Sequence, residues 1–256
     1  MSTDSLEADN LDQLFTEPAD FGTEDSTPTY LNYERQNPPA DEPAELTLRL
    51  VAKSPLWGHL LWNAGRVSAQ WIEQNRDYIK DRTVLELGAA AAVPSLLASL
   101  VARNVVITDY PDPNLIQNIQ YNIDLVKKSC PAKNLSLTAK GYIWGQDPQE
   151  LFDCEGQNGE KFDLIIMSDL VFNHSEHTRL VDTGLKCLKP DGKILVMFSP
   201  HRPRLYHKDL EFFDLAKEKG FHVEQIIEKR LNPMFEEDEE TKELRSMVFG
   251  YILTFA

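Results

Sequence analysis

Two spacings of hydrophobic residues alternate along this chain from about residue 46 onward. Short apolar runs predict buried strands, and runs with apolar residues every three or four positions predict helices between them. The predicted helices cover residues 56–75, 113–128, 175–188 and 205–219, and the predicted core strands cover 84–87, 105–109, 135–140, 162–168, 193–198, 221–228 and 247–255. Such an alternation predicts an α/β fold with a mainly parallel sheet.

Residues 84–109 are the most informative segment for ligand binding. The first strand ends at Gly88, which lets the backbone approach a ligand, and the alanine-rich stretch after it predicts a helix packed on the sheet. The next strand ends at Asp109, 21 residues later, where doubly wound folds place the acid that accepts ribose hydroxyl protons. The segment predicts an adenosine-ribose site. A plain βαβ unit with an alanine-rich packing helix is the alternative.

The residues after Gly88 argue against a dinucleotide. Dinucleotide folds use G-x-G-x-x-G, in which the second glycine admits a pyrophosphate against bare backbone. Here Gly88 is followed by four alanines, each with a Cβ where a diphosphate requires none. S-adenosyl-L-methionine (AdoMet) has an adenosine ribose and no phosphate, so we predict AdoMet as the cofactor.

The C-terminal end of the chain refines the fold class. The last two predicted strands are joined by an acidic loop instead of a helix, and a loop of this kind allows antiparallel pairing. A mostly parallel, seven-stranded sheet with a C-terminal antiparallel hairpin strand is the architecture of the class I AdoMet-dependent methyltransferases, which are Rossmann-like. We therefore predict this fold.

The charge of the chain is uneven. The net charge of the 256 residues is −15, and residues 1–45 contain twelve acidic residues, five prolines and one basic residue, Arg35. This predicts an acidic N-terminal extension over 1–45, followed by a methyltransferase domain over 46–256. Such a surface repels nucleic acid and favours a basic partner. A segment that only keeps the chain in solution is the alternative.

Other features of the composition predict a cytoplasmic protein. Residues 88–102 lack charges but contain Pro94, and no apolar run is long enough to cross a bilayer. The acidic N-terminus resembles neither a secretory nor a mitochondrial leader. The cysteines, Cys130, Cys154 and Cys187, form no C-x-x-C pair and are typical of reduced thiols. We expect a monomer that binds neither membranes nor nucleic acid.

Several short motifs resemble those of a known protein family. They are LWNA at 61–64, VLELGA at 84–89, TD at 108–109, WG at 144–145 and DLVF at 169–172. With these motifs, residues 46–256 resemble the family 16 seven-β-strand protein methyltransferases, also called nicotinamide N-methyltransferase-like. A fungal subgroup that methylates translation elongation factor 1-alpha is more similar still, through GYIWG at 141–145, SDLVFNH at 168–174, FSPHRP at 198–203 and PMFEEDEE at 233–240.

This resemblance implies a set of cofactor-binding residues. They are Trp62, Gly88, Ala89, Ala90, Asp109, Trp144 and Ser168. Trp62 is expected to contact AdoMet, residues 88–90 to line its methionine part, and Asp109 to bind the ribose hydroxyls. Trp144 is expected to pack on the adenine, and Ser168 to complete the pocket. Without the resemblance, the sequence favours both tryptophans as core aromatic residues.

The resemblance also implies the catalytic residues and the substrate. Asp169 and Phe172 occupy the family's Asp/Glu-x-x-Tyr/Phe motif, at the mouth where the amine enters. Aromatic walls attract a sulfonium and an ammonium, and a carboxylate orients the amine. The implied substrate is elongation factor 1-alpha, at its N-terminal glycine amine and the adjacent lysine. For Asp169, a helix N-cap is the alternative role.

Other functions remain possible from the sequence. The family's second name suggests a small-molecule, nicotinamide-type N-methyltransferase, and a non-catalytic AdoMet-fold partner protein is a third alternative. His174 and His201 have no cysteine or acid at metal-ligand spacing, so we expect no zinc site. No G-x-S-x-G motif supports a hydrolase. The acidic loop 236–240 is either solvated or attracts the basic tail of a protein substrate.

Overall fold

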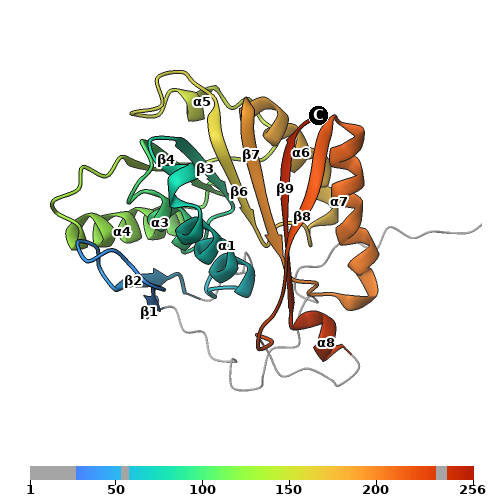
Figure 1. Cartoon of the computed structure of the whole chain (residues 1–256), viewed down its shortest axis with the longest axis horizontal. Coiled ribbons are helices and arrows are strands. Elements are labelled where there is room, and N and C mark those ends of the chain that lie inside the picture. The colour runs from blue at the N-terminus through green and yellow to red at the C-terminus, as the bar shows by residue number, and fades with distance from the viewer. Residues whose placement is uncertain (1–26, 53–57, 235–240) are drawn as a thin grey trace, which may run out of the picture.

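The computed structural model describes residues 27–52, 58–234 and 241–256, and the strands among them form two sheets (Figure 1). The strands are β1 (Thr29–Glu34), β2 (Glu45–Leu50), β3 (Thr83–Leu87), β4 (Asn104–Asp109), β5 (Leu137–Gly141), β6 (Phe162–Ser168), β7 (Leu188–Phe198), β8 (Phe221–Arg230) and β9 (Met247–Phe255). The larger sheet has the order β5-β4-β3-β6-β7-β9-β8. Its first five strands are parallel, and β9 pairs antiparallel with both β7 and β8. The predicted seven-stranded sheet with an antiparallel C-terminal strand is confirmed.

Helices cover both faces of this sheet (Figure 1). They are α1 (Asn63–Gln74), α2 (Arg76–Ile79), α3 (Val93–Ala98), α4 (Pro113–Ser129), α5 (Gln149–Phe152), α6 (His177–Cys187), α7 (Tyr206–Glu218) and α8 (Lys242–Arg245), with short 3-10 helices at His174–Glu176 and Pro203–Leu205. The first core layer contains α1, α3 and α4, and the second contains α6 and α7. Because both faces are covered, the central strands are apolar at nearly every position.

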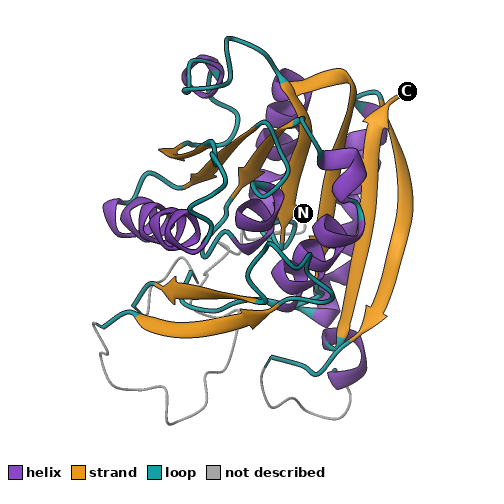
Figure 2. Ribbon diagram, turned by 60° about the vertical axis from the view of Figure 1, so that its left-hand side comes forward, coloured by secondary structure: helices purple, strands orange, loops and turns teal. Residues whose placement is uncertain are grey.

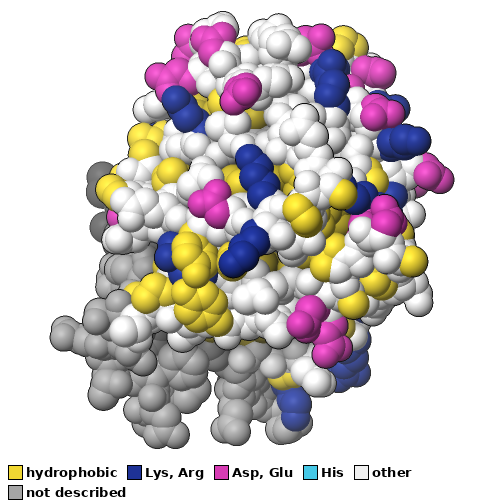
Figure 3. All heavy atoms as spheres, turned by 90° about the vertical axis from the view of Figure 1, so that its left-hand side faces the viewer, with side chains coloured by type: hydrophobic (Ala, Val, Ile, Leu, Met, Phe, Trp, Pro, Cys, Tyr) yellow, Lys and Arg dark blue, Asp and Glu magenta, His cyan; other side chains and the backbone are white. Residues whose placement is uncertain are grey.

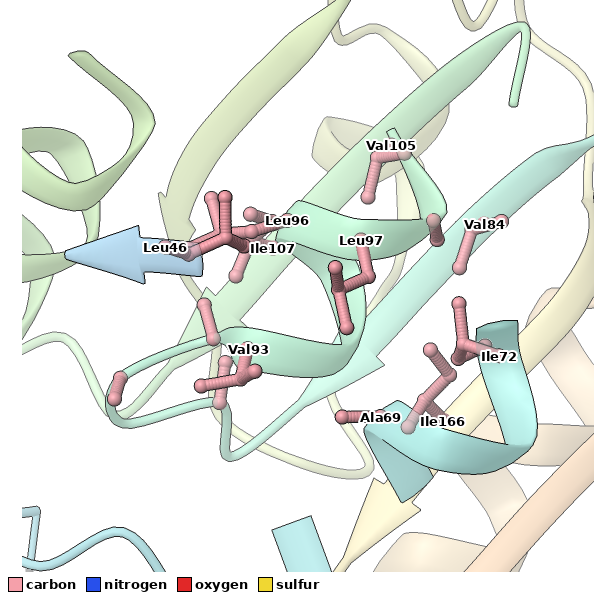
Figure 4. Close-up of a cluster of buried hydrophobic side chains, with 14 of the residues drawn as sticks. Leu46, Ala69, Ile72, Val84, Val93, Leu96, Leu97, Val105, Ile107 and Ile166 are labelled. Atoms are coloured by element: carbon pink, nitrogen blue, oxygen red, sulfur yellow. The ribbon is translucent and has the colours of Figure 1, made fainter. Parts of the chain in front are cut away.

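Alternate residues of each strand enter opposite layers. In the first layer, Ile72 of α1 and Leu97 of α3 lie around Val84 and Val105 of neighbouring strands (Figure 4). All of these side chains are at most 1% exposed. Leu85 follows Val84 in the chain and lies in the second layer instead. The central strands are therefore fixed from both sides, and their carboxyl ends are held in one row.

The start of a helix was predicted well for α4 and poorly for α1. The prediction of 113–128 agrees with α4, where the Asp112 side chain accepts a 2.8 Å hydrogen bond from the backbone N–H of Asn114. The helix predicted from residue 56 begins only at Asn63, since the backbone at Trp62 is extended, with ψ of 150°. Trp57, part of that prediction, lies outside the described residues.

The hairpin of β1 and β2 lies apart from the main sheet (Figure 2). Its strands pair antiparallel, and Leu46 and Leu48 are buried in the first core layer. Arg35 forms 2.7 Å ion pairs with Glu42 and with Glu73 of α1, so the hairpin is fastened to the domain. Part of the segment 1–45 is thus folded. Residues 1–26 lie outside the described residues, and the division of the chain at residue 45 stays a prediction.

Two segments between the predicted elements have structure of their own. Residues 189–192, between the predicted helix 175–188 and the predicted strand 193–198, lie within β7, where the pairing with β6 is irregular between Phe162 and Leu164. Residues 146–161, before the predicted strand 162–168, contain α5 and the fully buried Gln157. The Gln157 side chain accepts a 3.0 Å hydrogen bond from Asn104, so this connection is anchored to β4.

Candidate active site

The turn after β3 leaves no room for a side chain at Gly88. This glycine has a φ of +60°, and a Cβ placed on it would lie 2.6 Å from Cδ2 of Leu170 and 3.4 Å from Cζ2 of Trp144. Two predicted cofactor residues, Gly88 and Trp144, are therefore brought together by the fold. The bare backbone of Gly88 faces an aromatic ring, which suits the close approach of a flat or narrow ligand.

The alanines after Gly88 form a turn and not the predicted start of a helix. Ala90 and Ala92 have φ values of +47° and +63°, in the left-handed region that favours glycine, and α3 begins only at Val93. Ala89 is buried, and its N–H donates a 3.0 Å hydrogen bond to the carbonyl of Thr108. A helix packed on the sheet does follow, as predicted, but it starts later than the alanines, because the turn requires left-handed backbone at two of these positions.

The carboxylate of Asp109 faces this turn from the tip of β4. Oδ2 accepts a 2.7 Å hydrogen bond from the N–H of Ala90, and Oδ1 accepts one of equal length from the N–H of Tyr110. Burial raises the pKa of Asp109, and the two backbone donors oppose this effect. Each carboxylate oxygen has capacity for a second donor. The residue is therefore available to bind a ligand hydroxyl beside the turn.

A second acid, Glu86, lies beneath the turn and was not among the predicted site residues. Its side chain is 1% exposed, and Oε2 accepts a 3.2 Å hydrogen bond from the N–H of Ser95 in α3. Burial raises the pKa of Glu86 to about 8, and the Ser95 donor opposes this rise. Glu86 thus holds the first turn of α3 from below. Its place inside an apolar strand was the signal in the sequence that pointed to it.

The carboxyl end of β6 lies beside that of β3. The register pairs Met167 with Leu87, so Ser168 and Gly88 follow at adjacent strand ends. The Ser168 hydroxyl is 2.7 Å from the hydroxyl of the buried Ser68 in α1. Ser168 therefore joins the first core layer to the site, and Ser68 was missed because no motif marks it.

Asp169 is held in an unusual conformation directly after β6. It is 7% exposed, its φ is +61°, and its N–H donates a 2.7 Å hydrogen bond to the carbonyl of Met197. The alternative role as a helix N-cap is wrong, because Asn173 occupies the position before the next helical turn. A non-glycine residue in this conformation costs about 1–2 kcal/mol, and such strain is concentrated at functional sites.

The two oxygens of the Asp169 carboxylate have different surroundings. Oδ1 lies 3.2 Å from the donating N–H of Ser199 and 2.9 Å from Nε2 of His201. Oδ2 is buried and has no hydrogen-bond partner within the described part of the chain. Since a buried carboxylate oxygen without a donor is costly, Oδ2 suits an incoming donor such as an amine.

Aromatic rings line the same position. The His201 imidazole lies edge-on to Trp62, with ring centroids 4.9 Å apart, and edge-on to Phe172, with centroids 6.0 Å apart. Trp62 and Phe172, predicted from different motifs, thus meet through His201, whose place between two prolines in the sequence left it either shaping the substrate channel or only capping the sheet. The arrangement gathers two aromatic rings, an imidazole and one carboxylate, a combination that favours a cation.

The predicted site residues form two adjoining groups at the carboxyl ends of β3, β4 and β6. One group contains Gly88, Ala89, Ala90, Asp109 and Trp144, and the other contains Trp62, Asp169 and Phe172, with Ser168 between them. Leu170, which follows Asp169, reaches the space above Gly88 and links the groups. Open α/β sheets bind ligands at this end of their strands.

The described residues contain no group of three or more His, Cys, Asp and Glu side chains that could hold a metal ion. Within residues 27–52, 58–234 and 241–256, no helix is long and apolar enough to cross a membrane. On the face of the molecule drawn in Figure 3, acidic and basic side chains are interspersed. That face offers no continuous basic track for a nucleic acid.

A comparison with protein families identifies the chain. A family model described as lysine methyltransferase matches residues 43–219. The chain belongs to this family. It is 48% identical to the protein N-terminal and lysine N-methyltransferase of Yarrowia lipolytica, over 94% of this chain and 95% of that protein. The enzymes of the same name from Debaryomyces hansenii and Schizosaccharomyces pombe are 49% and 40% identical, and each match covers 94% of both chains.

Solved structures support the fold of this family member. The 16S rRNA N2 G1207 methyltransferase of T. thermophilus, solved with AdoMet and guanosine, matches with a TM-score of 0.53 at 15% identity, over 90% of this chain and 51% of that chain. The tRNA m1G37 methyltransferase of M. jannaschii matches with a TM-score of 0.50 at 14% identity, over 82% and 54%. The chain spans about half the length of each. These matches show the fold alone.

The predicted family, fold class, enzyme class and cofactor are confirmed. The lysine methyltransferase family member is an AdoMet-dependent enzyme, grouped by similarity over nearly its whole length with the protein N-terminal and lysine N-methyltransferases. The residues of the turn agree with AdoMet, because Gly88 is followed by four alanines and not by the further glycines of a phosphate-binding turn. The roles of individual site residues stay predictions.

Proposed function

We propose that this enzyme transfers methyl groups from AdoMet to translation elongation factor 1-alpha, at the N-terminal glycine amine and the adjacent lysine. The observation that supports it best is the buried Asp169 carboxylate, with Oδ2 lacking a partner among the described residues and aromatic rings beside it. Relatives that are named protein N-terminal and lysine N-methyltransferases support a protein amine as the acceptor.

In this proposal the cofactor lies across the ends of β3 and β4. Asp109 binds the ribose hydroxyls, Trp144 packs on the adenine, and residues 88–90 line the methionine part. Trp62 and Ser168 close the pocket toward the amine. When bound, AdoMet supplies a methyl group on a positively charged sulfur, which a nitrogen lone pair can take by in-line displacement. Gly88 has no space for a side chain, and the alanines after it form no glycine-lined cradle for a phosphate. The absence of such a cradle suits a ligand without phosphate.

In this proposal the residues at the mouth orient the amine and shield it from water. An amine arrives as an ammonium, and Oδ2 of Asp169 accepts a hydrogen bond from it and orients it toward the methyl carbon. One proton must pass from the ammonium to solvent before the nitrogen lone pair can form the new N–C bond. Phe172 and Trp62 exclude water from that position and attract the cation by their ring faces. Positioning of this kind accounts for much of the rate of such a reaction.

A protein acceptor is favoured over a heterocycle such as nicotinamide. The ring nitrogen of nicotinamide carries neither a charge nor a hydrogen before methylation, so Oδ2 of Asp169 cannot orient the reacting atom by accepting from it. An N-terminal amine and a lysine both carry the cation that Asp169 and the aromatic rings suit. The acidic residues of 1–45 add attraction for a lysine-containing tail. Residues 236–240, the other acidic segment, lie outside the described residues.

The proposal includes the setting in which the enzyme works. Elongation factor 1-alpha serves translation, so the enzyme is proposed to act in the cytoplasm. The site is built from one copy of the chain, which is consistent with a monomer. Sedimentation of the purified chain at micromolar concentration tests the monomer, and a dimer at that concentration contradicts it.

The experiment uses labelled AdoMet, the purified enzyme and three peptides of the substrate's N-terminus. The first peptide has a free glycine amine and the lysine, the second is acetylated at the glycine, and the third has the lysine replaced by arginine. We expect label in all three, with the largest incorporation in the first, and none in nicotinamide. Label in nicotinamide alone would favour the small-molecule enzyme. AdoMet binding without label in any acceptor would favour a non-catalytic protein.

A further inference from the structure

Two adjacent residues after β7, His201 and Arg202, each contact one member of the proposed catalytic pair. Nε2 of His201 lies 2.9 Å from Oδ1 of Asp169. The guanidinium of Arg202 donates a hydrogen bond to the backbone carbonyl of Phe172. The two members of each pair are about 30 residues apart in the chain, and the parallel pairing of β6 with β7 brings them together.

The contacts of His201 fix the direction of the Asp169 carboxylate. The Ser199 N–H and His201 both address Oδ1, so Oδ2 is turned away from this loop. The imidazole is itself 8% exposed and packed edge-on against Trp62 and Phe172. A ring held in this way restricts the carboxylate to one orientation. Removing the ring would free the carboxylate to rotate and would open a space beside both aromatic walls.

The contacts of Arg202 tie Phe172 to the rest of the domain. Besides the Phe172 carbonyl, the guanidinium lies 3.4 Å from Nδ1 of His174. Nε2 of His174 lies 2.7 Å from Oδ1 of Asp209, which is 2% exposed on α7. The segment that carries Phe172 is therefore linked through Arg202 and His174 to a buried carboxylate in the second core layer. This link adds to the contact between the carbonyl of Val171 and Nε2 of His177, 2.6 Å apart, which ties the same segment to α6.

We infer that His201 and Arg202 are positioning residues for methyl transfer, an inference that rests on the proposed function. His201 aims Oδ2 of Asp169 at the incoming amine, and Arg202 fixes the aromatic wall formed by Phe172. Neither residue needs to touch the substrate. Their effect should fall on the rate of transfer more than on the binding of AdoMet, because the proposed ribose and methionine contacts lie at the ends of β3 and β4, and Trp62 is the proposed cofactor residue that His201 touches.

The first test separates turnover from cofactor binding. His201→Ala should lower kcat on the free-amine peptide about 10- to 100-fold, as expected for a misaligned reacting group. Its AdoMet dissociation constant should stay within about twofold of wild type by calorimetry. His201→Gln, which keeps a donor toward Asp169, should recover part of the rate. His207→Ala, at an exposed histidine of α7, is the matched control and should match wild type.

Arg202 is tested in the same assay. Arg202→Met keeps most of the side-chain volume but removes the donors, and it should lower kcat about tenfold with little change in AdoMet affinity. Arg204→Met, at an exposed arginine two residues away, should leave kcat unchanged. Rates of Arg202→Met equal to wild type would overturn its role. A variant with a lower melting temperature, weaker AdoMet binding and lower kcat together would assign Arg202 to the scaffold.

A double-mutant cycle asks whether His201 acts through Asp169. If it does, His201→Gln should cost little rate once Asp169→Asn is present, so the two effects should not add. Additive effects would overturn the inference, and so would full activity of His201→Ala. The cycle uses His201→Gln, so it stays informative if His201→Ala fails to fold. Absence of turnover by the wild-type enzyme on the peptide would instead overturn the proposed function, which keeps the two failures distinct.

Discussion

The backbone N–H of Ala90 donates a 2.7 Å hydrogen bond to Oδ2 of Asp109, and this bond joins the turn after β3 to the tip of β4. The left-handed backbone at Ala90 aims the N–H at the carboxylate. Asp109 therefore shapes the turn in addition to facing the proposed ribose. Because this one carboxylate has both functions, we expect its removal to weaken ligand binding more than it lowers the stability of the core.

Replacing Asp109 tests its role in cofactor binding. Asp109→Ala removes charge-assisted hydrogen bonds worth about 1.5–3 kcal/mol, so AdoMet affinity should fall about tenfold or more. Calorimetric titration of the purified variant measures this effect. Asp124→Ala, at an exposed acid of α4, is the control and should bind AdoMet normally. An unchanged dissociation constant for Asp109→Ala, with wild-type melting, would remove Asp109 from the site.

Gly88 offers a test of the backbone and of the space above it. Gly88→Ala adds the cost of a left-handed residue, about 1–2 kcal/mol, and a Cβ only 2.6 Å from Leu170. Gly159→Ala is matched for conformation, with a φ of +75°, but nothing lies within 4 Å of its Cβ. The melting temperature should therefore fall more for Gly88→Ala than for Gly159→Ala. AdoMet binding should be lost in Gly88→Ala and kept in Gly159→Ala. Equal effects of the two variants would contradict a tight turn at Gly88.

The strand ends of the site could be predicted, but the contacts between them could not. Gly88, Asp109 and Asp169 each follow an apolar run, and the carboxyl ends of parallel strands meet at one edge of a sheet. Nothing local in the sequence indicates that Ala90 adopts left-handed backbone, because alanine is a strong helix former. The conformation is imposed by the Asp109 hydrogen bond, which exists only in the folded sheet.

His201 shows the same limit at longer range. Its partner Asp169 is 32 residues away, and only the pairing of β6 with β7 makes them neighbours.

The start of the first helix could not be predicted, for a different reason. The apolar spacing before Asn63 fits a helix. Leu61 is buried, but the backbone is extended at Trp62, just before α1 begins. Periodicity alone therefore could not place the boundary.

Glu86 makes a prediction about pH. Burial raises its pKa from the ordinary 4.5 to about 8, so between these values the folded state holds a proton that the unfolded state has lost. This one group therefore destabilises the fold increasingly as pH rises from 4.5 to 8. Glu86→Gln stays neutral and can still accept from Ser95. Its melting temperature should fall less than that of wild type between pH 5 and pH 8.

The control for this series is Glu211→Gln, at an exposed position of α7. Its melting temperature should follow the wild-type curve at each pH. Parallel curves for Glu86→Gln and wild type would mean that Glu86 is ionised throughout this range in the folded enzyme.

Glu42 should have the opposite dependence on pH. Burial alone would raise its pKa, but ion pairs with Lys133, Arg76 and Arg35 more than offset this and lower the pKa to about 2. A lowered carboxyl pKa stabilises the fold above about pH 4.5, and this contribution is lost as pH falls toward 2. At pH 7, Glu42→Gln should cost about 2–3 kcal/mol in urea unfolding. Glu45→Gln, at an exposed acid three residues away, should cost almost nothing, and equal costs would contradict the buried network.

Asp169→Asn separates the charge of the carboxylate from its shape. The amide keeps an acceptor for the Ser199 N–H and a similar volume beside His201, but it loses the negative charge that orients an ammonium. The methylation rate of the free-amine peptide should fall about 100-fold or more, because the amine is no longer held in line with the methyl carbon. AdoMet affinity should stay within about twofold of wild type. Asp191→Asn, at an exposed acid of β7, should retain full activity. Equal losses of rate and cofactor affinity in Asp169→Asn would place this residue in the cofactor pocket or the scaffold, and the amine would then need another acceptor at the mouth.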